Sequence, residues 1–225
     1  MISIQKLTKS YGQKQVLNEI NLDLEAGKVY GLIGQNGAGK TTFFRCLSGL
    51  EKFGGDIISD HKNLKDKLGF LQTNPDFMSR ITGWEYLKLV SIARGIQEEG
   101  FEEGNIFGLP LNEFAENYST GMKKKLALQG ILCQRNDLFL LDEPFNGVDI
   151  QSNMIISGII TKLKNHGKTI VISSHIFSTL SDICDQIILL NEGRISGIFE
   201  PSQFAGLEQE MKTFVIGNVL DRVKF

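Results

Sequence analysis

A lysine and two threonines follow a cluster of glycines in the stretch GQNGAGKTT. The pattern GxxxxGK[ST] is matched by Gly34, Gly39, Lys40 and Thr41, and it would place backbone N–H groups, an ammonium and a hydroxyl around nucleotide phosphates and Mg²⁺. Glycine suits such a loop because no Cβ prevents the backbone from approaching an anion. A flexible turn is the alternative. The stretch follows an apolar run and precedes an amphipathic one, which favours a phosphate-binding loop at a helix N-terminus.

Two carboxylates and a histidine end later apolar runs. Asp142 and Glu143 close the stretch LFLLDEP, and His175 closes VISSH. The carboxyl ends of strands form the ligand-binding edge of an open α/β sheet. Asp142 would therefore bind Mg²⁺ directly or through water, Glu143 would orient and deprotonate the attacking water, and His175 would contact the γ-phosphate. Taken alone, the acidic pair could be a solvated strand end and His175 a structural residue.

The elements that would position these side chains alternate between strand and helix. Ile20, Leu22 and Leu24 alternate with polar residues, which predicts a half-buried antiparallel strand, and KVYGLIG predicts a strand buried on both faces. A helix is expected from about Lys40 to Ser48, with weaker strands in GDIIS and LGFLQ. Further strands in DLFLLDEP, KTIVISS and QIILLNEG alternate with the helical stretches DIQSNMIISGIITKLKNHG and IFSTLSDIC. This alternation predicts parallel βαβ units.

The fold class that we expect is α/β: a P-loop NTPase core with a mostly parallel sheet, an N-terminal antiparallel β subdomain and an inserted α-helical subdomain. As one domain over residues 1–225, the chain would divide into a core (1–74 and 131–200), a helical subdomain (75–130) and a C-terminal segment (201–225). The helical patterns TGWEYLKLVSIARG and STGMKKKLALQGILCQ define the insertion, and the polar stretch IQEEGFEEGN between them predicts a surface loop. The C-terminal segment predicts a helix followed by an ambiguous stretch.

Composition narrows the class of protein. The chain of 225 residues has a net charge of −2, with 41% hydrophobic and 22% charged residues, so no basic field suggests a nucleic-acid partner. Its three cysteines form no CxxC pair, which predicts reduced thiols in a cytosolic protein. No signal-peptide pattern and no apolar run of roughly 20 residues is present. Such a protein would serve a membrane only through a partner.

These motifs, in this order and over nearly the whole chain, resemble the ATP-binding subunits of ABC transporters. Walker A corresponds to the stretch from Gly34 to Thr42, and Walker B to the stretch from Leu138 to Glu143. The resemblance implies further residues that contact ATP. They are Tyr11 stacked on adenine, the Walker A residues Asn36, Gly37 and Thr42, the signature residues Ser119 and Gly121, and Asp149 at the end of the D-loop.

The resemblance also implies a mechanism. Gln72, the glutamine-loop residue, would join Thr41 and Asp142 as a Mg²⁺ ligand and would link the γ-phosphate site to the helical subdomain. Two such domains would hold ATP between the Walker A of one and the signature of the other, with Ser119 capping a helix that faces the γ-phosphate. The pair would drive a separate membrane permease, docked near Gln72, Phe77 and Trp84, although these two aromatic residues could equally be core residues.

Some residues depart from the family pattern. The usual signature LSGGQ is altered by Tyr118, Thr120 and Met122, and the D-loop has Asn146 and Gly147 where many members have Ser and Ala. The form YS-x-GM resembles the export branch of the family, so we expect an exporter.

Two other functions are possible for the same motifs. One is a soluble ATPase acting on ribosomes or DNA, but those relatives carry two domains or a coiled-coil insertion, and this chain has neither. The other is a silent nucleotide-sensing subunit, against which Lys40, Glu143 and His175 argue. The transported substrate, and the choice between a homodimer and a heterodimer, stay open.

Overall fold

The computed structural model describes residues 1–96 and 104–209. Its strands are β1 (Ile2–Tyr11), β2 (Lys14–Leu24), β3 (Val29–Ile33), β4 (Gly54–Ser59), β5 (Leu68–Leu71), β6 (Leu138–Asp142), β7 (Thr169–Ser173), β8 (Gln186–Asn191) and β9 (Arg194–Phe199). Its α-helices are α1 (Lys40–Leu47), α2 (Gly83–Ile92), α3 (Thr120–Cys133), α4 (Ile150–Asn165) and α5 (Phe177–Ile183). Short 3₁₀ turns occupy Leu64–Lys67, Ala115–Asn117 and Pro201–Gln203.

Six strands form the central sheet in the order β5-β6-β7-β3-β8-β9. Neighbouring strands are parallel, except that β9 runs antiparallel to β8. In the register of this sheet Ser173 lies opposite both Leu32 and Asp142, and Leu71 lies opposite Leu141. The carboxyl ends of β3, β5, β6 and β7 therefore lie side by side at one edge, where ligands bind in open α/β sheets.

The central strands are continuous apolar runs because both faces of the sheet are covered. One face packs on α1 and on the antiparallel sheet β2-β1-β4, and the other face packs on α3, α4 and α5. The first face is formed by Tyr30, Leu32, Leu68, Leu138, Leu140, Val171, Ile188 and Leu190. The second is formed by Val29, Ile33, Leu71, Phe139, Leu141, Ile170, Ile172 and Ile187. This alternation fixes the register of each strand and hence the side chain at its end.

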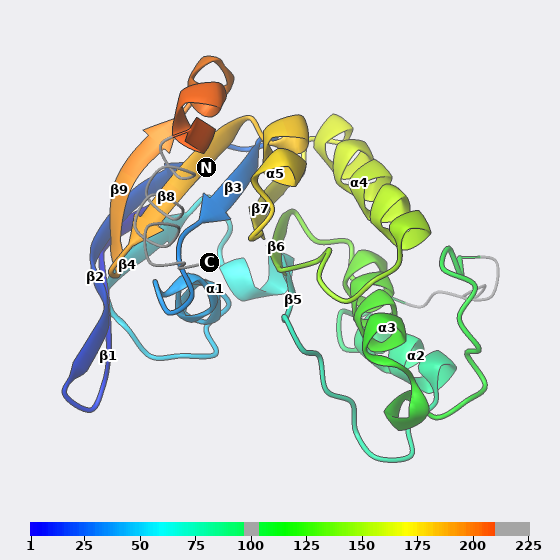
Figure 1. The fold of residues 1–225 in the computed structure, drawn as a ribbon. Coiled ribbons are helices and arrows are strands. Elements are labelled where there is room, and N and C mark those ends of the chain that lie inside the picture. The colour runs from blue at the N-terminus through cyan, green and yellow to red at the C-terminus, as the bar shows by residue number, and fades with distance from the viewer. Residues whose placement is uncertain (97–103, 210–225) are drawn as a thin grey trace, which may run out of the picture.

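Helices α2 and α3 lie between β5 and β6 in the chain and form a lobe to one side of the sheet, far from β1 and β2 (Figure 1). The lobe has a small apolar cluster of its own, which includes Leu87, Leu111 and Leu126. Thr82 and Glu85 form a reciprocal capping box that begins α2. Gly121 of α3 approaches the Gly147 carbonyl, and Lys124 of α3 donates to the Glu143 carbonyl, so this insertion contacts the segment that follows β6.

The expected fold class is confirmed, with differences at the edges. The strand predicted around Ile20 begins earlier, at Lys14, and β9 was not predicted. A helix was expected at the start of the C-terminal segment, and residues 204–209 are helical, following the 3₁₀ turn at 201–203. Residues 97–103 of the predicted acidic loop and residues 210–225 of the C-terminal segment lie outside the described residues. Within the described ranges, no helix is long and apolar enough to cross a membrane.

Candidate active site

The glycine-rich loop joins the end of β3 to the start of α1, as the sequence predicted. Gly37 and Gly39 have φ values of 86° and 111°, a region that side-chain-bearing residues rarely adopt. Gly39 is the N-cap residue of α1 and has no side chain with which to cap it. The first N–H groups of α1 are therefore available to an anion at the positive end of the helix dipole.

The Lys40 ammonium is folded into this loop. Its side chain is buried, and Nζ donates hydrogen bonds to the carbonyl oxygens of Gly34 at 2.7 Å and Gln35 at 3.3 Å. Burial lowers the pKa of Lys40 from its ordinary value, while the carboxylates of Glu143 and Asp142 act in the opposite direction. The lysine is thus held between the loop and the acidic end of β6.

Gly34 has a different constraint, which gives a testable prediction. A Cβ at this position would collide with the Leu190 carbonyl oxygen and lie 3.2 Å from the Ala38 Cβ. We expect Gly34→Ala to lower the free energy of unfolding by about 1–3 kcal/mol, because the backbone of β8 must move, and to weaken nucleotide binding. Denaturant unfolding and titration with a fluorescent ATP analogue measure both effects.

Gly158→Ala is the matched control. Gly158 lies exposed within α4 with no atom within 4 Å of an added Cβ. We expect it to leave binding unchanged and to stabilise the protein by about 0.5–1 kcal/mol. An equally stable, nucleotide-binding Gly34→Ala protein would contradict the prediction.

Asp142 is the centre of a hydroxyl cluster. Its side chain is 1% exposed, and its Oδ2 accepts hydrogen bonds from the hydroxyls of Thr41 and Thr73, both at 2.7 Å. Its Oδ1 accepts one from the Ser173 hydroxyl at 2.6 Å. Three elements, α1, β7 and the segment after β5, thereby converge on one carboxylate at the end of β6.

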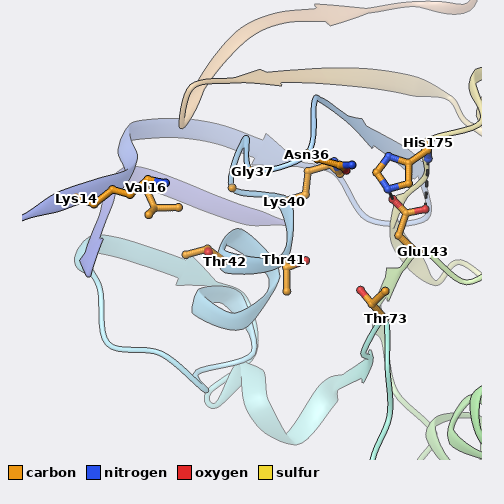
Figure 2. A pocket seen from close by; sticks show the side chains of 11 residues that line it. Lys14, Val16, Asn36, Gly37, Lys40, Thr41, Thr42, Thr73, Glu143 and His175 are labelled. Atoms are coloured by element: carbon orange, nitrogen blue, oxygen red, sulfur yellow. Dashed lines mark hydrogen bonds and ion pairs between the residues drawn. The ribbon is translucent and has the colours of Figure 1, made fainter. Parts of the chain in front are cut away.

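Glu143 follows directly, and its backbone has a φ of 52°, in the left-handed region. Its N–H donates to the Ser173 hydroxyl at 2.9 Å. Its Oε1 lies 3.0 Å from His175 Nε2 of the ring, and its Oε2 accepts a hydrogen bond from the backbone N–H of His175 at 3.3 Å (Figure 2). Burial raises the pKa of the Glu143 carboxyl, while His175 and Lys40 act in the opposite direction. A raised pKa makes a carboxylate a stronger general base.

A pocket of about 350 Å³ brings these groups together (Figure 2). Its lining is Lys14, Val16, Asn36, Gly37, Gly39, Lys40, Thr41, Thr42, Thr73, Glu143 and His175. Most of these residues were candidates from the sequence. Lys14, Val16 and Thr73 were not, although Thr73 follows the predicted strand LGFLQ and a hydroxyl at a parallel-strand end could have been noticed.

Gly34, Asp142, Tyr11 and Gln72 are candidates that lie outside this lining. Tyr11 ends β1 and is 45% exposed, with Lys9 Nζ 4.7 Å from its ring centroid. Gln72 follows β5 and is exposed, and the adjacent Thr73 supplies the hydroxyl that reaches Asp142.

The candidates from the signature and D-loop also lie outside the pocket lining, at the contact between α3 and the turn after β6. Ser119 is the N-cap residue of α3 and accepts from the Met122 N–H at 3.2 Å. A Cβ on Gly121 would lie 2.7 Å from the Gly147 carbonyl oxygen. Asp149 is the N-cap residue of α4. Its carboxylate accepts from the Ser152 N–H and hydroxyl, which lower its pKa to about 2.

Tyr118, where the resemblance expects leucine, is buried with its hydroxyl donating to the Pro110 carbonyl oxygen at 2.6 Å. We expect Tyr118→Phe to lower the free energy of unfolding by about 1 kcal/mol, because the carbonyl loses its donor inside the lobe. Denaturant unfolding measures this, and an unchanged transition would show that the hydrogen bond contributes nothing.

The donor set fits Mg²⁺. The described part of the chain has no group of three or more His, Cys, Asp and Glu residues that could hold a metal ion. Magnesium does not need such a cage, because it keeps several waters and binds through one or two carboxylates together with substrate phosphates. The Asp142 carboxylate with the Thr41 and Thr73 hydroxyls on one oxygen, next to the phosphate-binding loop, suits that mode of binding.

Known proteins are similar to this chain over most of its length. A family model described as ABC transporter matches residues 17–146. The chain is 35% identical over 208 residues to the bacitracin transport ATP-binding protein BcrA of Enterococcus faecalis, covering 87% of this chain and 68% of that protein. It is 36% identical over 208 residues to the lantibiotic transport ATP-binding protein SrtF of Streptococcus pyogenes, covering 87% and 89%.

A solved structure shares the fold. It is the dimeric, post-hydrolysis state of the ATP-binding cassette MJ0796 bound to ADP and Pi, with a TM-score of 0.80 and 21% identity, covering 89% of this chain and 99% of that one.

Proposed function

The chain belongs to the ABC transporter family, and from that premise we propose that it is the ATP-hydrolysing subunit of an exporter, pairing around two ATP molecules to power a separate membrane permease. Peptide antibiotics are the proposed cargo, because BcrA and SrtF are named for bacitracin and lantibiotic transport.

One observation carries the catalytic part of this proposal. The hydroxyls of Thr41 and Thr73 meet on one oxygen of the buried Asp142, while the next residue, Glu143, faces the pocket that Lys40 also lines. A metal-binding carboxylate, a phosphate-binding lysine and a second carboxylate in this arrangement are the parts that phosphoryl transfer to water requires.

In the proposed reaction, the loop amides and Lys40 hold the β- and γ-phosphates, and Glu143 orients a water against the γ-phosphorus. The water oxygen forms the new bond, the bond to the β–γ bridging oxygen breaks, and Glu143 accepts the water proton. His175, 3.0 Å from Glu143 Oε1, orients this carboxylate and contacts the γ-phosphate. Asn36, Gly37, Gly39, Thr42 and Thr73 complete the lining on the phosphate side.

Thr41 and Asp142 are the residues that would hold Mg²⁺, with Gln72 as a further ligand as the family resemblance implies. When bound, the ion neutralises charge on the phosphate oxygens. Gln72 is exposed, so we propose that it approaches the site when the helical subdomain moves.

The second half of each ATP site would come from a paired subunit. Ser119, Gly121 and Asp149 do not line this chain's pocket, and Ser119 is exposed at the start of α3. A helix N-terminus attracts an anion, so the α3 start of one subunit suits the γ-phosphate held by the other. ATP would thereby favour the closed pair, and hydrolysis would release it, as a shift between two populated states. Tyr11 would stack on the adenine.

The permease would dock on the helical side. Trp84 is 37% exposed on α2, whereas Phe77 packs edge-on against Tyr86 with ring centroids 4.8 Å apart. We place the contact at Gln72 and Trp84, and propose that the chain lies on the cytoplasmic side of the membrane through this contact. Residues 75–130 would act as the moving subdomain against the core of 1–74 and 131–200.

A resistance assay tests the proposal. A strain that lacks the chain is challenged with bacitracin and a lantibiotic, then complemented with the wild type or Glu143→Gln. We expect the loss of the chain to lower the inhibitory concentration and only the wild type to restore it. Equal restoration by Glu143→Gln, or no change in resistance on deletion, would contradict ATP-driven export of such peptides.

A further inference from the structure

Lys124 is a buried cation that neither the motifs nor the proposed reaction uses. It lies in the second turn of α3 and is 2% exposed. Its Nζ donates to the carbonyl oxygens of Glu143 at 2.8 Å and Asn146 at 2.6 Å. Burying an ammonium is costly unless hydrogen bonds replace its water, so these two carbonyls are strong determinants of where the side chain lies.

The hydrogen bond to Glu143 reaches a strained peptide. A left-handed φ at a residue other than glycine costs about 1–3 kcal/mol and persists only when its surroundings hold it. Glu143 has a φ of 52°; its N–H is held by the Ser173 hydroxyl and its carbonyl by Lys124. Hydrogen bonds therefore hold both the backbone N–H and the backbone carbonyl of Glu143, and they set the direction in which its side chain enters the pocket.

The same turn meets the start of α3 at two other points. Gly121 packs against the Gly147 carbonyl, and Lys125 Nζ lies 3.4 Å from the Asp149 carboxylate. These contacts are at the surface or between backbones. Of Gly121, Lys124 and Lys125, only Lys124 contacts Glu143, the residue whose carboxylate faces the pocket.

We propose that Lys124 is a positioning residue, which holds the backbone of Glu143 so that the carboxylate faces the γ-phosphate, and which ties that orientation to the signature helix α3. The proposal rests on the role of Glu143 in the proposed function. In the proposed pair, α3 of one subunit would contact the ATP held by the other subunit. Through Lys124, that contact would align Glu143 of the first subunit with the ATP in its own pocket.

The test compares Lys124→Met, which keeps the length and apolar stem but has no donor, with Lys123→Met on the same helix, whose side chain makes neither of these hydrogen bonds. We expect kcat for ATP to fall about 10- to 100-fold in Lys124→Met, because a misplacement of about 1 Å is enough to cost 100-fold. The KM for ATP and the affinity for a fluorescent ATP analogue should change less than about twofold, because the loop and Lys40 are intact. Lys123→Met should resemble the wild type.

A double variant separates positioning from loss of stability. If Lys124 acts through Glu143, adding Lys124→Met to Glu143→Gln should leave the residual turnover unchanged, whereas general destabilisation would lower it further. Lys124→Gln, which retains a neutral donor, is measured alongside in case the methionine variant fails to fold.

The results distinguish a failure of the Lys124 proposal from a failure of the proposed function. Wild-type kcat in a folded Lys124→Met protein, or an additive loss in the double variant, overturns the proposal, as does loss of nucleotide binding in both Lys124 variants. A wild-type protein without ATPase activity would overturn the proposed function itself.

Discussion

The Glu143→Gln variant is expected to bind ATP like the wild type and to lose at least about 100-fold of its hydrolysis rate, since a positioned general base contributes about 10²- to 10⁴-fold. Glutamine keeps the size of the side chain and an acceptor for the His175 N–H, now 3.3 Å from Glu143 Oε2. It has no carboxylate to accept the proton of the attacking water. Phosphate release under saturating ATP measures the loss.

Glu113→Gln is the control, because Glu113 is an exposed glutamate in the helical lobe, outside the pocket lining. We expect its turnover to match that of the wild type. If Glu143→Gln hydrolyses ATP at the wild-type rate, another group must act as the base, and the catalytic assignment fails.

The second large effect is expected at Lys40. Lys40→Ala removes a buried ammonium that the loop carbonyls of Gly34 and Gln35 hold beside the carboxylates of Asp142 and Glu143. Hydrogen bonds to charged groups contribute about 1.5–3 kcal/mol, so we expect the affinity for ATP to fall about 10- to 150-fold. Isothermal titration with ATP and Mg²⁺ measures the change.

An exposed lysine gives the comparison for Lys40. Lys62→Ala removes a charge of the same sign outside the pocket lining and should leave ATP affinity unchanged. An affinity of Lys40→Ala within twofold of the wild type would mean that the loop amides alone hold the phosphates.

The candidate catalytic residues could be found from the sequence because their positions follow from local pattern. Asp142 ends an apolar run and His175 follows another. The carboxyl ends of neighbouring parallel strands lie at the same edge of a sheet, so the two side chains are expected there. Lys40 and Thr41 are fixed by the spacing of the loop itself. Thr73 has the same kind of signal, one residue beyond Gln72, but the family resemblance points to the glutamine instead.

Other features depend on contacts that no local pattern records. Lys124 is the middle of three consecutive lysines on α3, and only the turn after β6 makes it the buried one. Strand β9 has half-exposed residues on alternate positions and a glycine at Gly197, so its apolar periodicity is weak. It forms by pairing with β8 at the edge of the sheet, a contact between segments that the sequence alone does not show to be partners.

Pairing of two copies around ATP is tested by the mass of Glu143→Gln in solution, measured by analytical ultracentrifugation with Mg²⁺ and either ATP or ADP. We expect a dimer with ATP, in which Walker A and the signature of two copies enclose uncleaved nucleotide, and a monomer with ADP. A variant that binds ATP yet stays monomeric at every concentration would contradict pairing of two copies around ATP.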